Sequence, residues 1–311
     1  MTRFDVIGFG ALNVDTLLKV DKIAGADDES FIHDSTEACG GSAANTTVGL
    51  ARLGCKVGFI GKVADDHQGN LQLNCFTTEG VNIDGIIRAP KGKSGVCLGF
   101  VDKKGARALY INPGVNDNIE FRELQANYIT NTQFLHLSSF VGDKSFRTQK
   151  KLMSFLPDSV KVSFDPGALY VQKGLSAIEP LIQNSYVMMP NLAELEHLTG
   201  ETDVPKGAEL LLQMGVKIVA VKLGAKGCYV TNGTDKRTIE PFKVPVADTT
   251  GAGDAFNAGF LYGLIHNKSI FECGRLGNFI ASKCVTKMGA RDGLVYGKDL
   301  VDSKHYQIPR A

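Results

Sequence analysis

The segment 248–256, Asp-Thr-Thr-Gly-Ala-Gly-Asp-Ala-Phe, joins a polar glycine-rich turn to a stretch of helical periodicity at 255–265. The small residues at 251–253 leave backbone N–H groups uncovered at the start of this predicted helix, where they have no helical partner. Such a helix terminus binds anions, for example a phosphate. Asp254 lies in the first turn, beside the expected anion, where a carboxylate is electrostatically unfavourable unless it has a chemical task, such as taking a proton from an attacking hydroxyl.

The same residues have a structural alternative, in which Asp254 only caps the helix and the glycines only form a tight connection. A bare Gly-X-Gly-Asp pattern would favour that alternative. The Asp-Thr-Thr before the glycines and the Ala-Phe after Asp254 favour the functional interpretation.

A second glycine-rich segment, 39–45, reads Cys-Gly-Gly-Ser-Ala-Ala-Asn and leads into another predicted helix. Its two glycines let a ligand approach the backbone closely, and Asn45 offers both a donor and an acceptor. Near the N-terminus, Asn13 and Asp15 follow a predicted strand, where a carboxylate can accept hydrogen bonds from substrate hydroxyls. The alternatives are a glycine turn with close helix packing and an ordinary Asn/Asp turn.

Two shorter segments carry residues that suit a nucleotide. Asn191 and Glu194 have the spacing of a helix capping box, which explains them structurally, or they contact Mg²⁺ or phosphate through water. The segment 221–227, Val-Lys-Leu-Gly-Ala-Lys-Gly, is a strand followed by a glycine turn with two cations. It forms either an ordinary hairpin into 228–231 or a turn that touches nucleotide phosphates.

Elements that could position these segments alternate along the chain. Apolar runs that are too short for helices predict strands at 4–9, 57–60, 134–137, 160–164, 186–189 and 218–223. Helical periodicity occurs at 43–53, 68–79, 146–155, 192–198, 208–214, 255–265 and 269–286. The alternation predicts an α/β fold around a doubly wound, mainly parallel sheet.

Two stretches, 13–37 and 94–113, break this alternation. Both read as pairs of short, half-polar strands, and the Lys-Lys-Gly at 103–105 indicates a hairpin turn. We therefore expect a small β-lobe that is inserted into the α/β body and covers it as a lid. No Pro/Gly/Ser-rich linker separates two domains, so the prediction is a single domain over residues 1–311.

The composition excludes several classes of protein. Of 311 residues, 43% are hydrophobic and 22% charged, as in a globular protein, and 34 Lys+Arg balance 33 Asp+Glu, which argues against nucleic acid or a membrane as partner. No apolar run approaches the roughly 18 residues of a membrane helix, and the N-terminus has no signal-peptide pattern. Seven scattered Cys without a CxxC pair predict reduced thiols in a cytoplasmic protein, and the six isolated His, which form no HExxH or His/Cys cluster, argue against metal ligation by His.

Taken together, the segments Gly-Gly-Ser-Ala-Ala-Asn (40–45), Asn-x-x-Glu (191–194), Leu-Gly-Ala-Lys-Gly (223–227) and 248–256 closely resemble the ribokinase (PfkB-type) family of carbohydrate and nucleoside kinases. The resemblance extends over about 6–289. It implies a ribokinase-like α/β fold, with a central mainly parallel sheet flanked by helices and a small β-sheet lid over the acceptor site. It also implies transfer of the γ-phosphoryl group of ATP to a hydroxyl, with Mg²⁺ and, as in many members, a monovalent cation such as K⁺.

The resemblance assigns roles residue by residue. Asp254 matches the catalytic base, and Gly251, Ala252 and Gly253 match the anion hole for the transferred phosphoryl group. The residues expected to hold the acceptor are Asn13, Asp15, Gly40, Gly41, Asn45 and Asp254. The residues expected to bind ATP are Asn191, Glu194, Lys222, Gly224, Gly227, Gly251, Gly253, Asn278 and Ala281. Glu194 would reach Mg²⁺ through water, and Asp248 and Thr250 match part of a monovalent-cation site.

The acceptor is left open by the sequence. A ribose- or fructose-like sugar is the first hypothesis and a nucleoside the second, since Phe31, Phe100 and Tyr110 could sandwich a base, although core packing explains them equally well. A sugar acid or a phosphosugar is less favoured. A phosphosugar would require converging cations, and the cations in and near 94–113 suit a solvated hairpin better. A non-catalytic sensor is the least favoured. An exposed lid edge could pair two copies into a homodimer, although monomeric relatives also exist.

Overall fold

The large sheet forms the centre of the protein. The structure is a computed structural model that describes residues 3–104 and 106–302, so Gly105 of the predicted hairpin turn lies outside the described residues. Nine strands are arranged in the order β13-β12-β11-β10-β9-β8-β1-β4-β5. They are β1 (Phe4–Phe9), β4 (Val57–Ala64), β5 (Ile86–Ala89), β8 (Thr132–Leu137), β9 (Lys161–Phe164), β10 (Ser185–Met188), β11 (Ile218–Lys222), β12 (Cys228–Thr231) and β13 (Lys236–Ile239).

The sheet is parallel from β5 to β11 and antiparallel only at the β12 and β13 edge. All six strands predicted from apolar runs are present, with bounds shifted at some ends. The segment 221–227 contains a turn and is followed by an antiparallel strand, β12, as the hairpin interpretation predicted. Every residue of β4 is buried, as expected of a strand that is covered on both faces.

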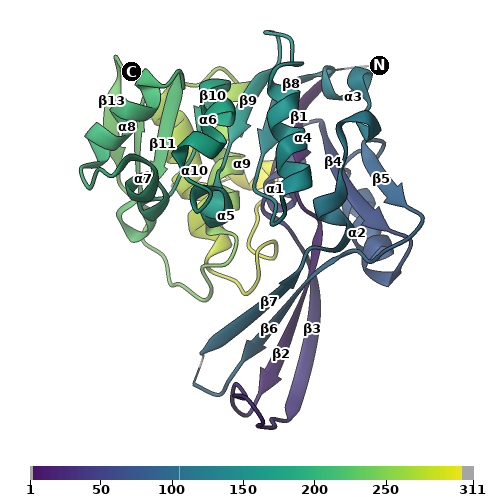
Figure 1. The fold of residues 1–311 in the computed structure, drawn as a ribbon. Coiled ribbons are helices and arrows are strands. Elements are labelled where there is room, and N and C mark those ends of the chain that lie inside the picture. The colour runs from purple at the N-terminus through teal and green to yellow at the C-terminus, as the bar shows by residue number, and fades with distance from the viewer. Residues whose placement is uncertain (1–2, 105, 303–311) are drawn as a thin grey trace.

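Helices cover both faces of the sheet (Figure 1). The helices are α1 (Ser42–Arg52), α2 (His67–Thr78), α3 (Ala126–Ile129), α4 (Asp143–Met153), α5 (Gly167–Val171), α6 (Leu175–Gln183), α7 (Leu192–Thr199), α8 (Val204–Gln213), α9 (Ala252–Ile265), α10 (Ile270–Cys284) and α11 (Gly297–Asp302). Consecutive residues of one strand point to opposite faces of the sheet and pack in different cores. Val6 packs in the cluster with α1, α9 and α10, whereas Ile7 packs in the cluster with α4, α6 and α8.

Helix α9, which begins at the glycine-rich turn, is buried over most of its length. It packs between α1 and α10, which explains why its apolar residues are distributed around the helix. A Cβ at Gly259 would come within 2.7 Å of the Leu276 carbonyl oxygen and 2.9 Å of Gly277, so glycine permits the close approach of α9 and α10. The position of the N-terminus of α9 is therefore set by tight packing along the rest of the helix.

A separate four-stranded sheet, in the order β3-β2-β6-β7, projects from one end of the body (Figure 1). Its strands are β2 (Asn13–Val20), β3 (Ile32–Gly40), β6 (Gly95–Val101) and β7 (Arg107–Asn112). The two predicted strand pairs, β2–β3 and β6–β7, are antiparallel, and β2 joins β6 in parallel. The expected fold class, a mainly parallel sheet flanked by helices with a second small β-sheet, is confirmed.

One expectation about the cysteines is wrong. Cys39, at the end of β3, forms a disulfide with Cys75 on α2, whereas the sequence predicted only reduced thiols. The two residues are 36 positions apart, and only the fold brings the end of β3 against α2, so no local spacing indicated the pair. Within 3–104 and 106–302, the free cysteines are Cys55, Cys97, Cys228, Cys273 and Cys284.

No helix in the described part of the chain has the length and apolar character needed to cross a lipid bilayer.

Candidate active site

The N-terminus of α9 is shaped by glycine. Gly251 precedes the helix with φ 77°, in the left-handed region, and a Cβ at this position would lie 2.6 Å from the Cβ of Ala290. The first turn of α9, which contains Gly253, has backbone N–H groups without carbonyl partners in the helix. A Cβ at Gly253 would stand 3.5 Å from Nζ of Lys222, so the ammonium group lies close to this turn. A helix terminus and an ammonium group placed in this way can bind an anion, so we call them the candidate anion site.

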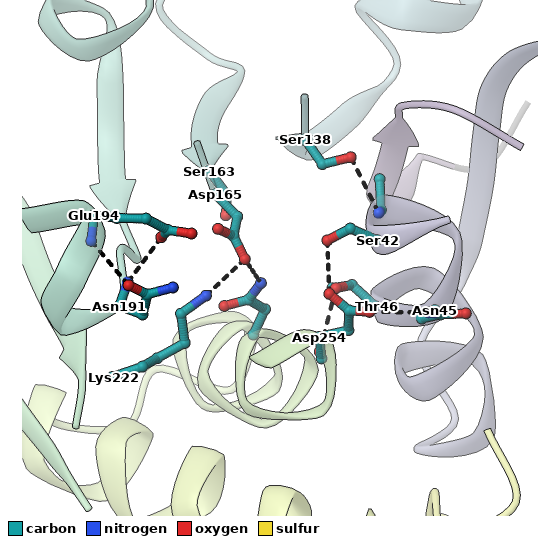
Figure 2. Close-up of polar contacts among 12 residues, drawn as sticks. Ser42, Asn45, Thr46, Ser138, Ser163, Asp165, Asn191, Glu194, Lys222 and Asp254 are labelled. Carbon is teal, nitrogen blue, oxygen red and sulfur yellow. Dashed lines mark hydrogen bonds and ion pairs between the residues drawn. The ribbon is translucent and has the colours of Figure 1, made fainter. Parts of the chain in front are cut away.

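Asp254, in the same turn, is held by α1 (Figure 2). Oγ of Ser42 donates to Oδ1 at 2.6 Å, and Nδ2 of Asn45 donates to Oδ2 at 2.9 Å. Burial raises the pKa of Asp254 to about 6, against the lowering effect of these two hydrogen bonds. Asp254 is therefore ionised at neutral pH and more basic than an ordinary aspartate, which suits a general base.

The sequence analysis missed two partners of Asp254. Ser42 donates to its carboxylate, and Oγ1 of Thr46 donates to its main-chain oxygen at 3.2 Å. Both belong to α1, where Ser42, Asn45 and Thr46 have i, i+3 and i+4 spacing and so share one face. That spacing was visible in the sequence, but the position of α9 opposite this face was not.

A buried ion pair lies on the other side of the α9 terminus (Figure 2). Asp165 follows β9 and Lys222 ends β11, and Oδ2 of Asp165 accepts from Nζ of Lys222 at 2.7 Å and from Nδ2 of Asn257 at 2.5 Å. Burial alone would lower the pKa of Lys222, but the carboxylates of Asp165 and Glu194 raise it above its ordinary value. Lys222 is thus a fixed cation. The sequence analysis missed Asp165 and Asn257, although Asp165 stands at the end of a predicted strand, as Asp15 was expected to.

Asn191 and Glu194 form the capping box that the sequence predicted as their structural explanation. Oδ1 of Asn191 accepts from the Glu194 N–H at 2.9 Å, and Oε2 of Glu194 accepts from the Asn191 N–H at 2.8 Å. Figure 2 shows the Glu194 carboxylate facing Asp165. Burial first, and then the negative charge of Asp165, raise the pKa of Glu194.

A cavity of about 440 Å³ begins at the candidate anion site and is lined by α9, α10, the turn at 222–227 and the segment 241–249. It brings together six residues predicted for the nucleotide: Lys222, Gly224, Gly227, Gly253, Asn278 and Ala281. Its apolar walls include Phe242, Val244, Val246, Phe256 and Val285. Nδ2 of Asn278 donates at 3.1 Å to the backbone oxygens of both Ile239 and Glu240, which fixes this side chain at the wall. A cavity of this size and character suits an aromatic base.

The residues predicted for the acceptor gather where the small sheet meets α1. Burial raises the pKa of Asp15 to about 6, against the lowering effect of Arg291. A Cβ at Gly40 would collide with the Asp15 carboxylate, so this glycine makes room for it. Oδ1 of Asn13 accepts from Nδ2 of Asn116 at 2.9 Å. Gly41 precedes α1 directly, which places this group next to Ser42 and therefore next to Asp254.

Asp248 and Thr250 lie in the loop before α9. Oδ1 of Asp248 accepts from the Thr250 N–H at 3.0 Å and from its Oγ1 at 2.8 Å. Oδ2 of Asp248 accepts from the Gly289 N–H at 2.9 Å, which connects this loop to the segment after α10. In the described part of the chain, no group of three or more His, Cys, Asp or Glu could hold a metal ion.

Comparison with known proteins identifies relatives along most of the chain. The family model described as pfkB family carbohydrate kinase matches residues 3–295. An "Uncharacterized sugar kinase" of Archaeoglobus fulgidus is 46% identical over 250 residues, 79% of this chain and 98% of that protein. An "ATP-dependent ribose-1-phosphate kinase" of Halopiger xanaduensis is 31% identical over 92% of this chain and 93% of its own. A ribokinase structure from Thermotoga maritima has a TM-score of 0.86 at 28% identity, covering 96% and 98%.

Proposed function

Because the chain belongs to the PfkB family of carbohydrate kinases, we propose that it transfers the γ-phosphoryl group of ATP to a hydroxyl of a small ribose- or fructose-like sugar. Such kinases are phosphotransferases with an alcohol group as acceptor. The observation that carries the proposal is the position of Asp254: a basic carboxylate in the first turn of α9, beside Lys222 and the mouth of the nucleotide-sized cavity.

The residues divide the chemical work between them. Asp254 takes the proton of the acceptor hydroxyl as the hydroxyl oxygen attacks the γ-phosphorus, while the bond from that phosphorus to the β–γ bridging oxygen breaks and ADP leaves. The first-turn N–H groups of α9 and the Lys222 ammonium stabilise the negative charge of the transferred group. Asp165 and Asn257 hold Lys222 in place, so that its charge does not have to reorganise during the reaction.

The region around the candidate anion site also fits a divalent cation. Glu194 and Asp165 place two carboxylates near one ammonium, and since burial and the charge of Asp165 raise the pKa of Glu194, a further cation beside it would favour its ionised form. Hydrated Mg²⁺ bound through water to Glu194 would supply that charge and neutralise the phosphates of ATP. Asp248 and Thr250, with backbone around 286–289, would hold K⁺.

The small sheet would act as the lid over the acceptor, within a single domain over residues 1–311. Closure would exclude the water that otherwise hydrolyses ATP. Its exposed apolar residues, among them Phe31, Ile32, Leu109 and Ile111, also suit pairing with a second copy of the chain. We propose a homodimer through this sheet; a molar mass near 33.4 kDa in light scattering would contradict it.

A nucleoside is the second candidate acceptor, because two lid aromatics are not part of a core. Phe31 is 74% exposed and Tyr110 is 60% exposed, so core packing does not account for them. Tyr110 lies edge-on to Phe100, with 5.7 Å between ring centroids. Such rings could stack on a base when the lid closes.

One assay separates these candidates. Purified protein with Mg-ATP is tested against pentoses, hexoses, sugar acids, nucleosides and phosphosugars, with ADP release as readout and with K⁺ or Na⁺ as the salt. A sugar should raise ADP release far above the ATP-only background, and K⁺ should stimulate it. A response to nucleosides alone would select the second candidate. No response to any acceptor, with ATP still bound, would contradict the kinase proposal.

A further inference from the structure

Arg291, which the sequence analysis did not single out, makes the outer contact of the hydrogen-bond chain that ends at Asp254. Its Nε donates to Oδ1 of Asn45 at 2.8 Å, and Nδ2 of the same amide donates to Oδ2 of Asp254 at 2.9 Å. Asn45 is only 5% exposed, so its amide has little access to water as an alternative partner. Arg291 and Asp254 are 37 positions apart in the sequence and are connected here through one side chain.

The chemistry of the three groups fixes the orientation of the Asn45 amide. A guanidinium can only donate and an ionised carboxylate can only accept, so the amide oxygen must face Arg291 and the amide nitrogen must face Asp254. The flipped amide would set its oxygen against a carboxylate and its N–H₂ group against a cation. Without Arg291, Oδ1 of Asn45 loses its donor, and the orientation that serves Asp254 is no longer imposed.

Arg291 is itself held by α1 and α2. Nη1 of Arg52 donates to the main-chain oxygen of Arg291 at 2.6 Å, and Arg52 in turn pairs with Glu79 at 2.5 Å and 2.9 Å. The guanidinium carbon of Arg291 lies 5.9 Å from the ring centre of Phe76. Nη2 of Arg291 is buried without a hydrogen-bond partner in the structure, so the hydrogen bond that this guanidinium makes toward Asp254 runs from Nε through Asn45.

The charged groups that face Asp254 come from several elements. Lys222, at the end of β11, lowers the pKa of Asp254, and Asp165, after β9, raises it. Cys284 of α10 and Arg291, which follows α10, also interact electrostatically with Asp254. The hydrogen bond from Asn45 favours the ionised carboxylate. Weakening that bond therefore raises the pKa of Asp254, and the pH needed to ionise the base rises with it.

We propose that Arg291 is a positioning residue for the general base: it orients Asn45, which in turn orients Asp254 and keeps it ionised. The proposal rests on the proposed role of Asp254, but the hydrogen-bond chain can be tested without catalysis. The test uses four proteins: wild type, Arg291→Met, Asn45→Ala and the double variant. Arg122→Met is the control, since Arg122 is an exposed arginine in a surface ion pair with Glu120.

The first readout is the Asp254 carboxyl ¹³C titration by NMR, with the resonance assigned by its loss in Asp254→Asn. Arg291→Met should raise the pKa of Asp254 by about one unit, and the shift in the double variant should be smaller than the sum of the two single shifts, because Arg291 acts through Asn45. Arg122→Met should titrate like wild type. An unchanged pKa in Arg291→Met, or additive shifts in the double variant, would overturn the proposal.

The second readout covers the case in which Arg291→Met does not fold. In wild type, the Nε–H resonance of Arg291 should shift with the same midpoint as the Asp254 carboxyl, and Asn45→Ala should abolish that shift. A resonance insensitive to the titration of Asp254 would refute the chain. If the wild type phosphorylates no acceptor, the proposed function fails while both NMR results still decide the role of Arg291.

Discussion

The Asp165–Lys222 pair allows a sharp prediction because both partners are buried. The side chains are 7% and 13% exposed, and Nζ lies 2.7 Å from Oδ2. At an effective dielectric constant of about 20, their Coulomb attraction is about 6 kcal/mol, and the cost of desolvating both ions offsets much of it. Removing one charge leaves the other buried without its counter-ion, which costs roughly 3–5 kcal/mol.

Asp165→Asn should therefore lower the free energy of unfolding at pH 7 by roughly 3–5 kcal/mol, measured by urea titration. Lys222 then loses the carboxylate that keeps its pKa high, so turnover should fall as well. The double variant Asp165→Asn/Lys222→Met removes both charges and should regain much of the stability, but not the turnover. A loss below about 0.5 kcal/mol in Asp165→Asn, or a double variant with the summed loss of both single variants, would refute the reasoning.

The stability contributed by Asp165 also depends on pH. Burial alone would raise its pKa, but Lys222 and Asn257 lower it below the ordinary 3.8. The stabilisation is therefore present above about pH 4 and is lost as the pH falls through the folded-state pKa, whereas Asp165→Asn removes this loss. The difference in unfolding free energy between the two proteins, measured by urea titration between pH 3 and 7, should therefore narrow as the pH falls below about 4.

Three further variants test separate parts of the site. Gly251→Ala places a Cβ against Ala290 at a left-handed φ of 77°, so the free energy of unfolding measured by urea titration should fall by roughly 1–3 kcal/mol and turnover should fall as well. A variant as stable as the wild type would contradict this geometry. Ser42→Ala removes a donor from ionised Asp254, so its pKa should rise from about 6 and the acid limb of kcat/KM should move to higher pH; an unmoved limb would contradict this. Ala281→Phe should fill part of the 440 Å³ cavity and raise the Kd for ATP at least tenfold in calorimetry, and an unchanged Kd would exclude that site.

Much of this site was predictable because its segments are local. The glycine turn before α9 and the Asn191–Glu194 capping box each lie within a few consecutive residues, so residue type and spacing were enough. The strands of the large sheet were predictable for a similar reason, since burial on both faces produces short, fully apolar runs.

The remaining parts depend on contacts between distant segments. Asp165 and Asn257 are 92 positions apart and Arg291 and Asn45 are 246 apart, and neither pair forms a local pattern. The same holds for the Cys39–Cys75 disulfide, which the cysteine spacing did not indicate. In each case the sequence shows the two residues far apart, and only the packing of helices and strand ends in the folded protein brings them into contact.

The most direct test of the central claim is the turnover of Asp254→Asn with the best acceptor from the panel, measured together with its affinity for ATP. Asparagine keeps the shape of the side chain but cannot accept the proton, and general-base catalysis contributes roughly 10²–10⁴-fold. The account predicts a fall in kcat of at least 10²-fold with an unchanged Kd for ATP and an unchanged fold by circular dichroism. Turnover near that of wild type would contradict the assignment of Asp254 as the base.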